Sequence, residues 1–332
     1  MYDTTLSCIV GFDIIKSEEG NTILEAKKGM SVESELKSFS KYSWYSVGGS
    51  CNGLLYLSMH QIDYITSLVV IHPLWKEIYK LPPIKRRLDG PYYLSEEPHG
   101  LGFDVSTNTF KMVFVLSGKE ISKSGTSISN YLCTMVHVLG MDSSWREIPQ
   151  VPPYPTSGDG IYAHGCLYWL VSSQKKKCFI CFDVRNEEFT LIYRPKRRGG
   201  YFVNHHQLVY LQGEVEYIYF YSDNIIEVWV LKQKRWVKHC RFSKKPPLTR
   251  CHIEVLGRWN RYRDLLIKSF AAGRNSWFVY SLKSRVLDEV NILGQKYGHN
   301  AHMYMYPASS MFSIGSIKKS TAHLIKADLN AG

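Results

Sequence analysis

The sequence predicts an all-β protein, specifically a β-propeller of six blades. Three observations support this class: aromatic residues make up 14% of the 332 residues, short apolar runs alternate with polar turns, and the pattern repeats along the chain. Flat rings pack well on the pleated surface of a sheet. Repeats of roughly 40 to 50 residues, with about four short strands in each, are typical of propeller blades.

The spacing of large residues after polar turns sets the period. Four such anchors, Trp145, Phe189, Trp236 and Val286, are separated by 44, 47 and 50 residues. Each follows an apolar run that reads as a strand. We therefore expect blades at about 50–83, 100–150, 160–195, 205–243 and 251–292.

A Phe-Asp step ends an apolar run at three places: Phe12-Asp13, Phe103-Asp104 and Phe182-Asp183. An aspartate at the end of a strand accepts hydrogen bonds from the backbone just after it, which favours a turn. The last two steps therefore predict hairpins whose second strands restart at Phe110 and Phe189. Apolar residues occupy both alternating faces of 110–116, which predicts a strand buried on both sides.

Glycine marks a second kind of turn. It precedes an apolar run in Asn52-Gly53 and His164-Gly165. A weaker match to the same pattern, without the glycine, starts at His206. Glycine reaches backbone conformations closed to other residues, so these pairs predict tight turns before a strand.

The two ends of the chain are expected to form the closing blade. A hairpin near residue 19 and a strand within 304–314 would join there and remove the exposed edges of an open stack. We thus expect one domain in which 1–49 supply N-terminal strands of the closing blade, 50–292 form five repeat blades, and 293–332 supply the closing strand and tail. Two packed sandwiches are the alternative, but they do not explain the period.

Charge and hydropathy limit the classes of function. The 41 Lys and Arg residues exceed the 29 acidic ones, giving a formal net charge of +12. Such a surface attracts acidic proteins, nucleic acid or anionic membranes without choosing among them. No apolar run approaches the ~20 residues of a membrane helix, and the N-terminus lacks the basic start of a signal peptide. The eight dispersed cysteines fit a reducing compartment, so we expect a cytoplasmic or nuclear protein.

Few patterns point to catalysis or metal binding. Cys178 and Cys181 have the CxxC spacing, but residues three apart in a strand point to opposite faces. The pairs His205-His206 and His299…His302 lack a nearby acid or cysteine to complete a metal site. No GxSxG motif or phosphate loop is present. We expect no enzyme activity, no metal and no cofactor.

Two loops between blades carry the candidate binding residues. Residues 84–93 and 193–202 combine arginine with aromatic side chains in turn-rich segments. Binding residues are often found on loops of a rigid scaffold, and Arg and Tyr are favoured contact residues. A solvated loop, or a nuclear import signal within 194–198, is the alternative. The predicted partner-binding residues are Arg86, Arg87, Tyr92, Tyr93, Arg197 and Arg198.

Two other basic stretches favour RNA as a rival ligand. Residues 232–241 surround Trp236 with cations, and 258–263 do the same for Trp259. Single-stranded RNA is often held by aromatic stacking between cations. Trp236, however, is a blade anchor, so core packing explains it better.

An ordered set of short motifs resembles a known family. The motifs are 50–57, 70–73 with 81–83, 102–105, 145–149, and 164–170 with 182–184. In this order they resemble the F-box-associated interaction domain of plant F-box proteins, which include F-box/kelch-repeat-like proteins. The likeness covers 50–190 and fades after that. Where His72 precedes Pro73, the family usually has asparagine.

This resemblance implies a fold and a role. The family's domain is a kelch-type β-propeller that forms the substrate-recognition part of an SCF-type ubiquitin ligase and binds a protein target. A Skp-type adaptor and a cullin are implied as partners if an F-box lies upstream. Residues 1–49 show no recognisable F-box, since they read as strands and a short polar helix. A basic RNA-binding or scaffold propeller is the alternative; nucleic acid is not favoured, and no membrane is expected.

Overall fold

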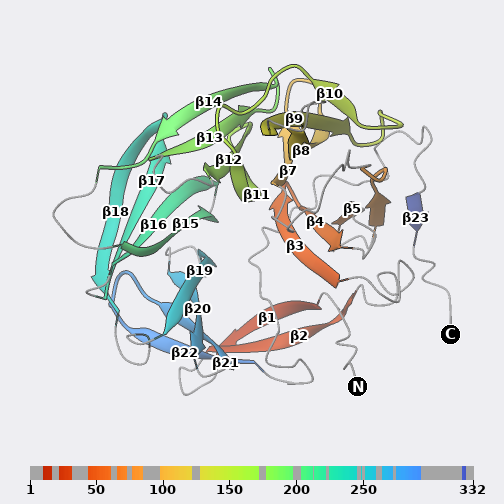
Figure 1. Ribbon diagram of the computed structural model, residues 1–332. Coiled ribbons are helices and arrows are strands. Elements are labelled where there is room, and N and C mark those ends of the chain that lie inside the picture. The colour runs from red at the N-terminus through yellow and green to blue at the C-terminus, as the bar shows by residue number, and fades with distance from the viewer. Residues whose placement is uncertain are drawn as a thin grey trace, which may run out of the picture. The chain divides into compact units, whose positions relative to one another are not determined.

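A computed structural model confirms the all-β class, because its regular elements are strands (Figure 1). The structure describes residues 10–16, 22–31, 44–60, 66–72, 77–84, 98–121, 128–171, 177–196, 203–211, 213–221, 224–244, 248, 251–258, 264–271, 274–292 and 324–326. In these ranges no helix is long and apolar enough to cross a membrane.

The chain forms two compact units. Unit 1 comprises Met1–Cys8, Val32–Arg194 and Pro307–Gly332, and unit 2 comprises Ile9–Ser31 and Pro195–Tyr306. Each unit consists of antiparallel blades of the propeller class, built from four consecutive strands of the chain. The assignment of the whole chain to one domain stays a prediction.

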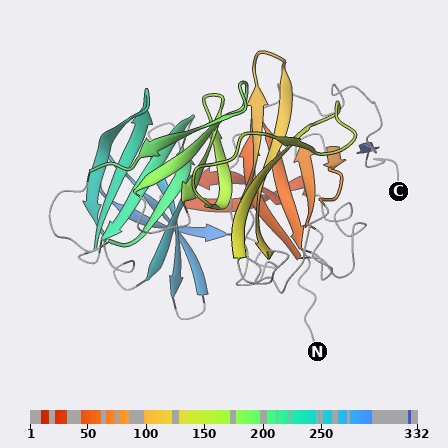
Figure 2. The same cartoon turned by 45° about the horizontal axis from the view of Figure 1, so that its top comes forward.

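The described residues of unit 1 form three blades. The first consists of β3 (Trp44–Cys51), β4 (Leu54–His60), β5 (Thr66–His72) and β6 (Glu77–Lys80), with β23 (Leu324–Lys326) paired to β6. The second consists of β7 (His99–Asp104), β8 (Thr109–Ile121), β9 (Ile128–Val138) and β10 (Arg146–Ile148). The third consists of β11 (Thr156–Ala163), β12 (Cys166–Val171), β13 (Cys178–Asp183) and β14 (Glu188–Tyr193). The β8–β9 hairpin extends beyond its two neighbouring strands (Figure 2).

In unit 2 the part of the chain that the structure describes forms two blades. The first consists of β15 (Val203–Leu211), β16 (Glu214–Tyr221), β17 (Ile225–Lys232) and β18 (Arg235–Ser243). The second consists of β19 (His252–Arg258), β20 (Leu265–Ala271), β21 (Arg274–Tyr280) and β22 (Leu287–Ile292). The hairpin of β1 (Val10–Lys16) and β2 (Thr22–Ser31) extends this second sheet.

The expected count of six blades is wrong for the part of the chain that the structure describes, which forms five sheets. The N-terminal hairpin does not begin a new blade, because β2 pairs in parallel with β22 through Thr22–Leu24 and Val290–Ile292. An open strand edge offers unpaired backbone groups to any strand that reaches it, and β2 satisfies them here. The predicted closing strand within 304–314 lies outside the described residues.

The predicted anchors take equivalent positions. Phe189 and Trp236 are each the second residue of the fourth strand of their blade, and Trp145 and Val286 directly precede β10 and β22. The period read from the sequence is therefore the period of the third-to-fourth-strand hairpin.

The two predicted glycine turns are confirmed. Asn52-Gly53 and His164-Gly165 each form a two-residue turn with positive φ at both positions (44° and 89°; 49° and 77°), the conformation that suits the twist of a hairpin. The weaker apolar run that starts at His206 has no glycine and lies inside β15, and the turn after β15 contains Gly213. Asp13 also lies inside its strand, because β1 continues to Lys16.

Apolar side chains fill the space between neighbouring blades of a unit. In unit 1, Tyr56 of the first blade and Trp169 of the third both donate a hydrogen bond to the backbone carbonyl of His99 on β7, each at 3.3 Å. The Cβ position of Gly160 on β11 lies 2.7 Å from the Trp169 ring, so only glycine fits there. These contacts hold β7 between its two neighbours.

A polar link joins the first two blades. The Tyr79 hydroxyl lies 3.1 Å from Nε2 of His137 and accepts a hydrogen bond from the Gly140 backbone N–H at 3.1 Å. His137 Nδ1 lies 3.3 Å from the Ser144 carbonyl, which only accepts, so the proton sits on Nδ1 and Nε2 accepts from Tyr79. Both side chains are buried.

Candidate functional site

The six sequence-predicted binding residues lie outside the described residues. Arg86, Arg87, Tyr92 and Tyr93 belong to 85–97, and Arg197 and Arg198 to 197–202. Their role stays a prediction.

The two predicted aspartate hairpins are confirmed, and they are the local structures from which the candidate site is built. Asp104 ends β7, and its Oδ1 accepts hydrogen bonds from the Ser106 backbone at 2.9 Å and the Ser106 hydroxyl at 2.6 Å. Asp183 ends β13, and its Oδ1 accepts from the backbone of Arg185 and Asn186 at 2.9 and 3.0 Å. Both turns are thereby fixed by their own aspartate.

The two hairpins are alike in their aromatic pairs but occupy different positions in their blades. Phe103 faces Phe110 and Phe182 faces Phe189, with ring centroids 4.8 Å apart in both. Asp104 follows the first strand of its blade, whereas Asp183 follows the third. The motif is therefore a local turn signal and does not mark one blade position.

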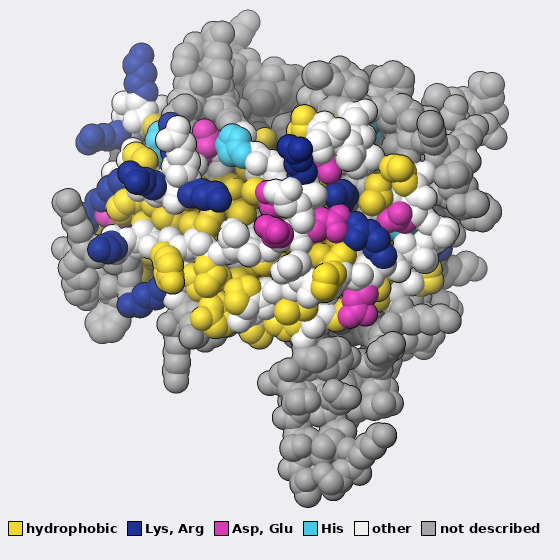
Figure 3. Space-filling view, turned by 90° about the horizontal axis from the view of Figure 1, so that it is seen from above, with side chains coloured by type: hydrophobic (Ala, Val, Ile, Leu, Met, Phe, Trp, Pro, Cys, Tyr) yellow, Lys and Arg dark blue, Asp and Glu magenta, His cyan; other side chains and the backbone are white. Residues whose placement is uncertain are grey.

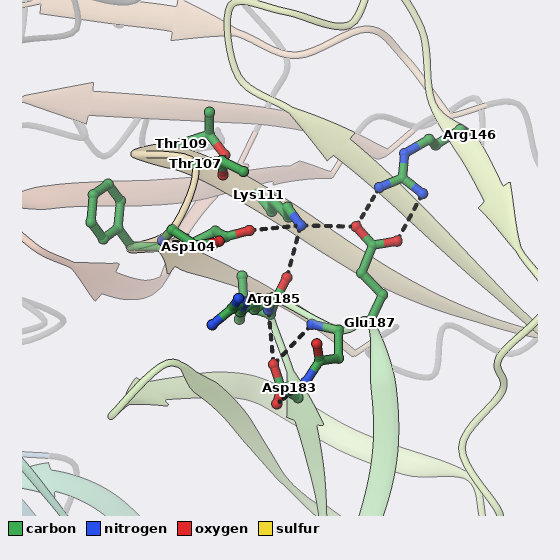
Figure 4. A network of polar contacts seen from close by, with 12 residues as sticks. Asp104, Thr107, Thr109, Lys111, Arg146, Asp183, Arg185 and Glu187 are labelled. Atoms are coloured by element: carbon green, nitrogen blue, oxygen red, sulfur yellow. Dashed lines mark hydrogen bonds and ion pairs between the residues drawn. The ribbon is translucent and has the colours of Figure 1, made fainter.

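Lys111 on β8 connects these turns. Its Nζ lies 3.2 Å from Oδ2 of Asp104 and 3.0 Å from Oε1 of Glu187, and it donates to the Val184 carbonyl at 2.8 Å (Figure 4). The Lys111 side chain is only 10% exposed, as expected for a strand buried on both sides. A charge in this position requires partners, and two carboxylates and a carbonyl supply them.

Arg146 on β10 completes the network. Its guanidinium binds Glu187 with both terminal nitrogens, Nη1 at 2.8 Å from Oε2 and Nη2 against Oε1 (Figure 4). Burial works against ionisation of Glu187, but Arg146 and Lys111 outweigh it and hold the pKa of this carboxyl below its usual value. Burial likewise opposes ionisation of Asp104, whose pKa nonetheless falls to about 2 because Ser106 and Lys111 donate to it. Both carboxylates therefore stay ionised near neutral pH.

Two exposed apolar side chains lie in turns of the blade that contains Lys111 and Arg146. Val105 is 76% exposed in the β7–β8 turn, and Met141 is 65% exposed in the β9–β10 turn. Strands β7 and β9 run in the same direction, so the turns that follow them lie at the same end of the blade. We call Val105, Met141, Arg146, Arg185 and Glu187 the turn face. A surface that combines exposed apolar side chains with hydrogen-bonded charged side chains is suited to contact with another protein.

Sequence reasoning missed the turn face. One signal was available: Lys111 is the only cation in the apolar run 110–116, and a lone cation in such a run calls for a buried partner. Val105 and Met141 gave no signal, because single exposed apolar residues are common in turns.

The cysteines do not form the site that their spacing suggests. Cys178 and Cys181 are buried at opposite faces of β13, and only Cys178 belongs to the apolar cluster between the second and third blades. The thiol of Cys181 contacts Cys166, and this hydrogen bond, together with burial, raises its pKa well above the usual value. A protonated buried thiol is a poor nucleophile and ligand.

The described histidine pair also has structural contacts. His205 stacks on Phe220 with centroids 4.0 Å apart, and its Nε2 lies 3.0 Å from the Ile253 carbonyl. Burial lowers its pKa. Within the described ranges no group of three or more His, Cys, Asp or Glu side chains could hold a metal ion. His299, His302 and Trp259 lie outside those ranges.

The described blades define a class, a β-propeller whose turns lie at the ends of its strands. The sequence model of the F-box associated beta propeller domain matches residues 4–306, so the chain belongs to this family. The resemblance read from the motifs is confirmed.

Curated relatives come from Arabidopsis thaliana. F-box protein At3g07870 is 25% identical over 225 residues, which cover 63% of this chain and 52% of that protein. F-box protein At1g47340 is 25% identical over 227 residues, covering 63% of this chain and 43% of that protein. The chain thus spans about half the length of these relatives. Among solved structures, Aleuria aurantia lectin in complex with Fucalpha1-6GlcNAc has a TM-score of 0.42 at 10% identity, covering 84% of this chain and 91% of the lectin chain.

Proposed function

We propose that this chain is the target-recognition part of an F-box protein and binds the protein that a ubiquitin ligase modifies. The observation that carries this proposal is the family match over residues 4–306, together with curated relatives that are named F-box proteins. The role is binding without catalysis. We further propose that it acts in the cytoplasm or nucleus.

The turn face supports a binding role in physical terms. A surface fixed before binding loses little conformational freedom when a partner docks, so more of the contact energy remains as affinity. Lys111, Glu187 and Arg146 fix the turns of two neighbouring blades in this way. Val105 and Met141 then present apolar surface that a partner can bury.

The route to a ligase belongs to the whole protein. A Skp-type adaptor would dock on an F-box, and a cullin would follow through the adaptor. We propose these two partners for the protein that contains this chain and a protein target for the propeller itself.

Affinity purification from plant tissue extract tests the proposal. The tagged chain is compared with the variant Val105→Asp/Met141→Asp, and with Val151→Asp/Val286→Asp as control, since those two valines are also exposed but lie elsewhere. We expect a protein that the wild type and the control retain, that the turn-face variant loses, and that accumulates in tissue when the proteasome is inhibited. Equal recovery by all three chains would contradict the use of the turn face.

A second arm tests the predicted loops. The variant Arg197→Ala/Arg198→Ala should reduce recovery of the same target. Retention of every partner by this variant would show that the two arginines are not part of the interface. The net charge of +12 is also compatible with the rival function, RNA binding or a general scaffold. Recovery of RNA that added salt releases, with no protein dependent on the turn face, would support that rival, because counterion release makes nucleic-acid binding steeply salt-dependent.

A further inference from the structure

We infer that strand β18 and the turn before it bind an acidic segment of a partner protein. This inference rests on the proposed protein-binding role and names the chemistry of one partner. It concerns unit 2 alone and is independent of the turn face.

Five exposed cations carry the inference. Lys232 ends β17, Lys234 lies in the turn, and Arg235, Lys238 and Arg241 lie on β18; we call these five residues the basic edge. Between Ile225 and Ser243 the only acidic residue is Glu227. Figure 3 shows Lys and Arg side chains gathered towards the left of the view, the side on which β17 and β18 lie in Figure 1.

Glu227 neutralises only part of this charge. Its Oε1 lies 2.5 Å from Lys238 Nζ and 3.8 Å from Arg241 Nε, and its Oε2 accepts from the Tyr221 hydroxyl at 3.1 Å. Glu227 itself is buried, so it is not available to a partner. Lys232, Lys234 and Arg235 have no ion pair among the described residues. The hairpin end of the basic edge is therefore the part with unmet positive charge.

The turn between β17 and β18 has a strained backbone. Gln233 and Lys234 have φ values of 48° and 61°, the left-handed region that a two-residue hairpin turn requires. Asn-Gly fills such a turn with little strain, whereas a long side chain there is disfavoured. Backbone strain of this kind occurs at binding sites, where the side chain serves a contact.

The basic edge has more cations than the protection of an open strand edge requires. β18 ends the strand order of its sheet, and no strand pairs with its outer side in the described part of the chain. A few charges of either sign are enough to discourage edge pairing. Here five charges have one sign, and an extra residue, His239, interrupts the register between Lys238 and Cys240. This bulge disfavours a continuous added strand, so we infer contact through side chains.

The aromatic residues of this blade favour carboxylates over nucleic acid bases. Single-stranded nucleic acid needs exposed ring faces for stacking. Trp236 is only partly exposed and packs against Tyr217 at 5.9 Å, and Lys238 Nζ covers the Trp229 ring at 5.8 Å from its centroid. Trp236 is thus a packing residue, as its anchor position predicts. Arg and Lys with covered rings suit the carboxylates of Asp and Glu.

Fluorescence anisotropy with the purified full chain tests the inference. The probe is a short labelled peptide of alternating Glu and Asp, compared with a single-stranded oligonucleotide of equal charge. The variant is Lys232→Glu/Lys234→Glu/Arg235→Glu. Its control is Lys177→Glu/Lys196→Glu/Lys283→Glu, which changes net charge equally at exposed lysines elsewhere. Far-UV circular dichroism checks that both variants fold.

We expect the basic-edge variant to bind the peptide about tenfold more weakly or worse, and the control to lose much less. Lys234→Gly, which relieves the turn, should raise thermal stability and still weaken binding. Three results would overturn the inference: no peptide binding, equal loss in variant and control, or tighter binding of the oligonucleotide than of the peptide at the same salt. This experiment uses neither an adaptor nor plant extract. A negative result would therefore contradict the inference about the basic edge without contradicting the target-recognition proposal.

Discussion

Lys111 on β8 and Glu187 in the β13–β14 turn lie 3.0 Å apart, Nζ to Oε1, across two neighbouring blades of unit 1. The same Nζ contacts Asp104 and the Val184 carbonyl. One buried cation thus holds a turn from each blade, and the shape of the turn face depends on it.

Replacement of Lys111 tests this dependence. Lys111→Met keeps the apolar stem but leaves two acidic groups without their shared cation, and breaking a buried ion pair in this way costs about 3 kcal/mol or more. The free energy of unfolding, measured by urea titration, should fall by that amount. Lys177→Met, at an exposed lysine, should change it by no more than about 0.5 kcal/mol. Equal small changes in both variants would show that Lys111 does not hold the turns.

The depressed pKa of Asp104 predicts a loss of stability in acid. An unfolded aspartate has a pKa near 3.9, whereas folding lowers that of Asp104 to about 2. The stabilisation is therefore present above about pH 4 and is lost as pH falls from 4 to 2, with a total of about 2–3 kcal/mol. Asp104→Asn should flatten this part of the profile of unfolding free energy against pH. A profile parallel to that of the wild type would contradict the assignment.

The local parts of the fold could be predicted from sequence because their causes are local. An aspartate at the end of a strand fixes its own turn within three residues, as Asp104 and Asp183 do. A glycine after Asn52 or His164 permits the left-handed turn directly. The period of the anchors followed from these turns and did not require tertiary information.

The parts that failed depend on distant partners. Glu187 lies 76 positions from Lys111, and no local pattern connects them. The pairing of β2 with β22 joins the two ends of unit 2 through backbone groups, which every residue has, so side-chain patterns cannot select it. Val105 and Met141 are exposed but carry no distinguishing pattern in the sequence, and composition could only direct attention to arginine-rich loops.

His137 predicts a second pH effect, at milder pH. Burial lowers its pKa, although the Ser144 carbonyl and Asp142 act against this. An unfolded histidine has a pKa near 6.5, so the stabilisation is present above that pH and is lost as pH falls through the lower value of the folded state. His137→Gln should reduce the drop in melting temperature between pH 7.5 and about 5. His164→Asn, at an exposed turn histidine, should leave that drop unchanged.

Gly102 on β7 lies so close to Val184 of the third blade that a second substitution should relieve the clash caused by the first. A Cβ at this position would lie 2.6 Å from Cγ2 of Val184, closer than atoms can approach, so Gly102→Ala must displace the third blade or its turn. We expect a loss of about 1–3 kcal/mol in unfolding free energy, typical of an overpacked core. Val184→Ala removes the methyl groups that clash but also leaves a gap when made alone. The double variant Gly102→Ala/Val184→Ala should therefore be more stable than the sum of the two single losses predicts, since the new methyl group fills the space that Val184 vacates. Additive losses in urea titrations of the four chains would show that these two residues do not meet.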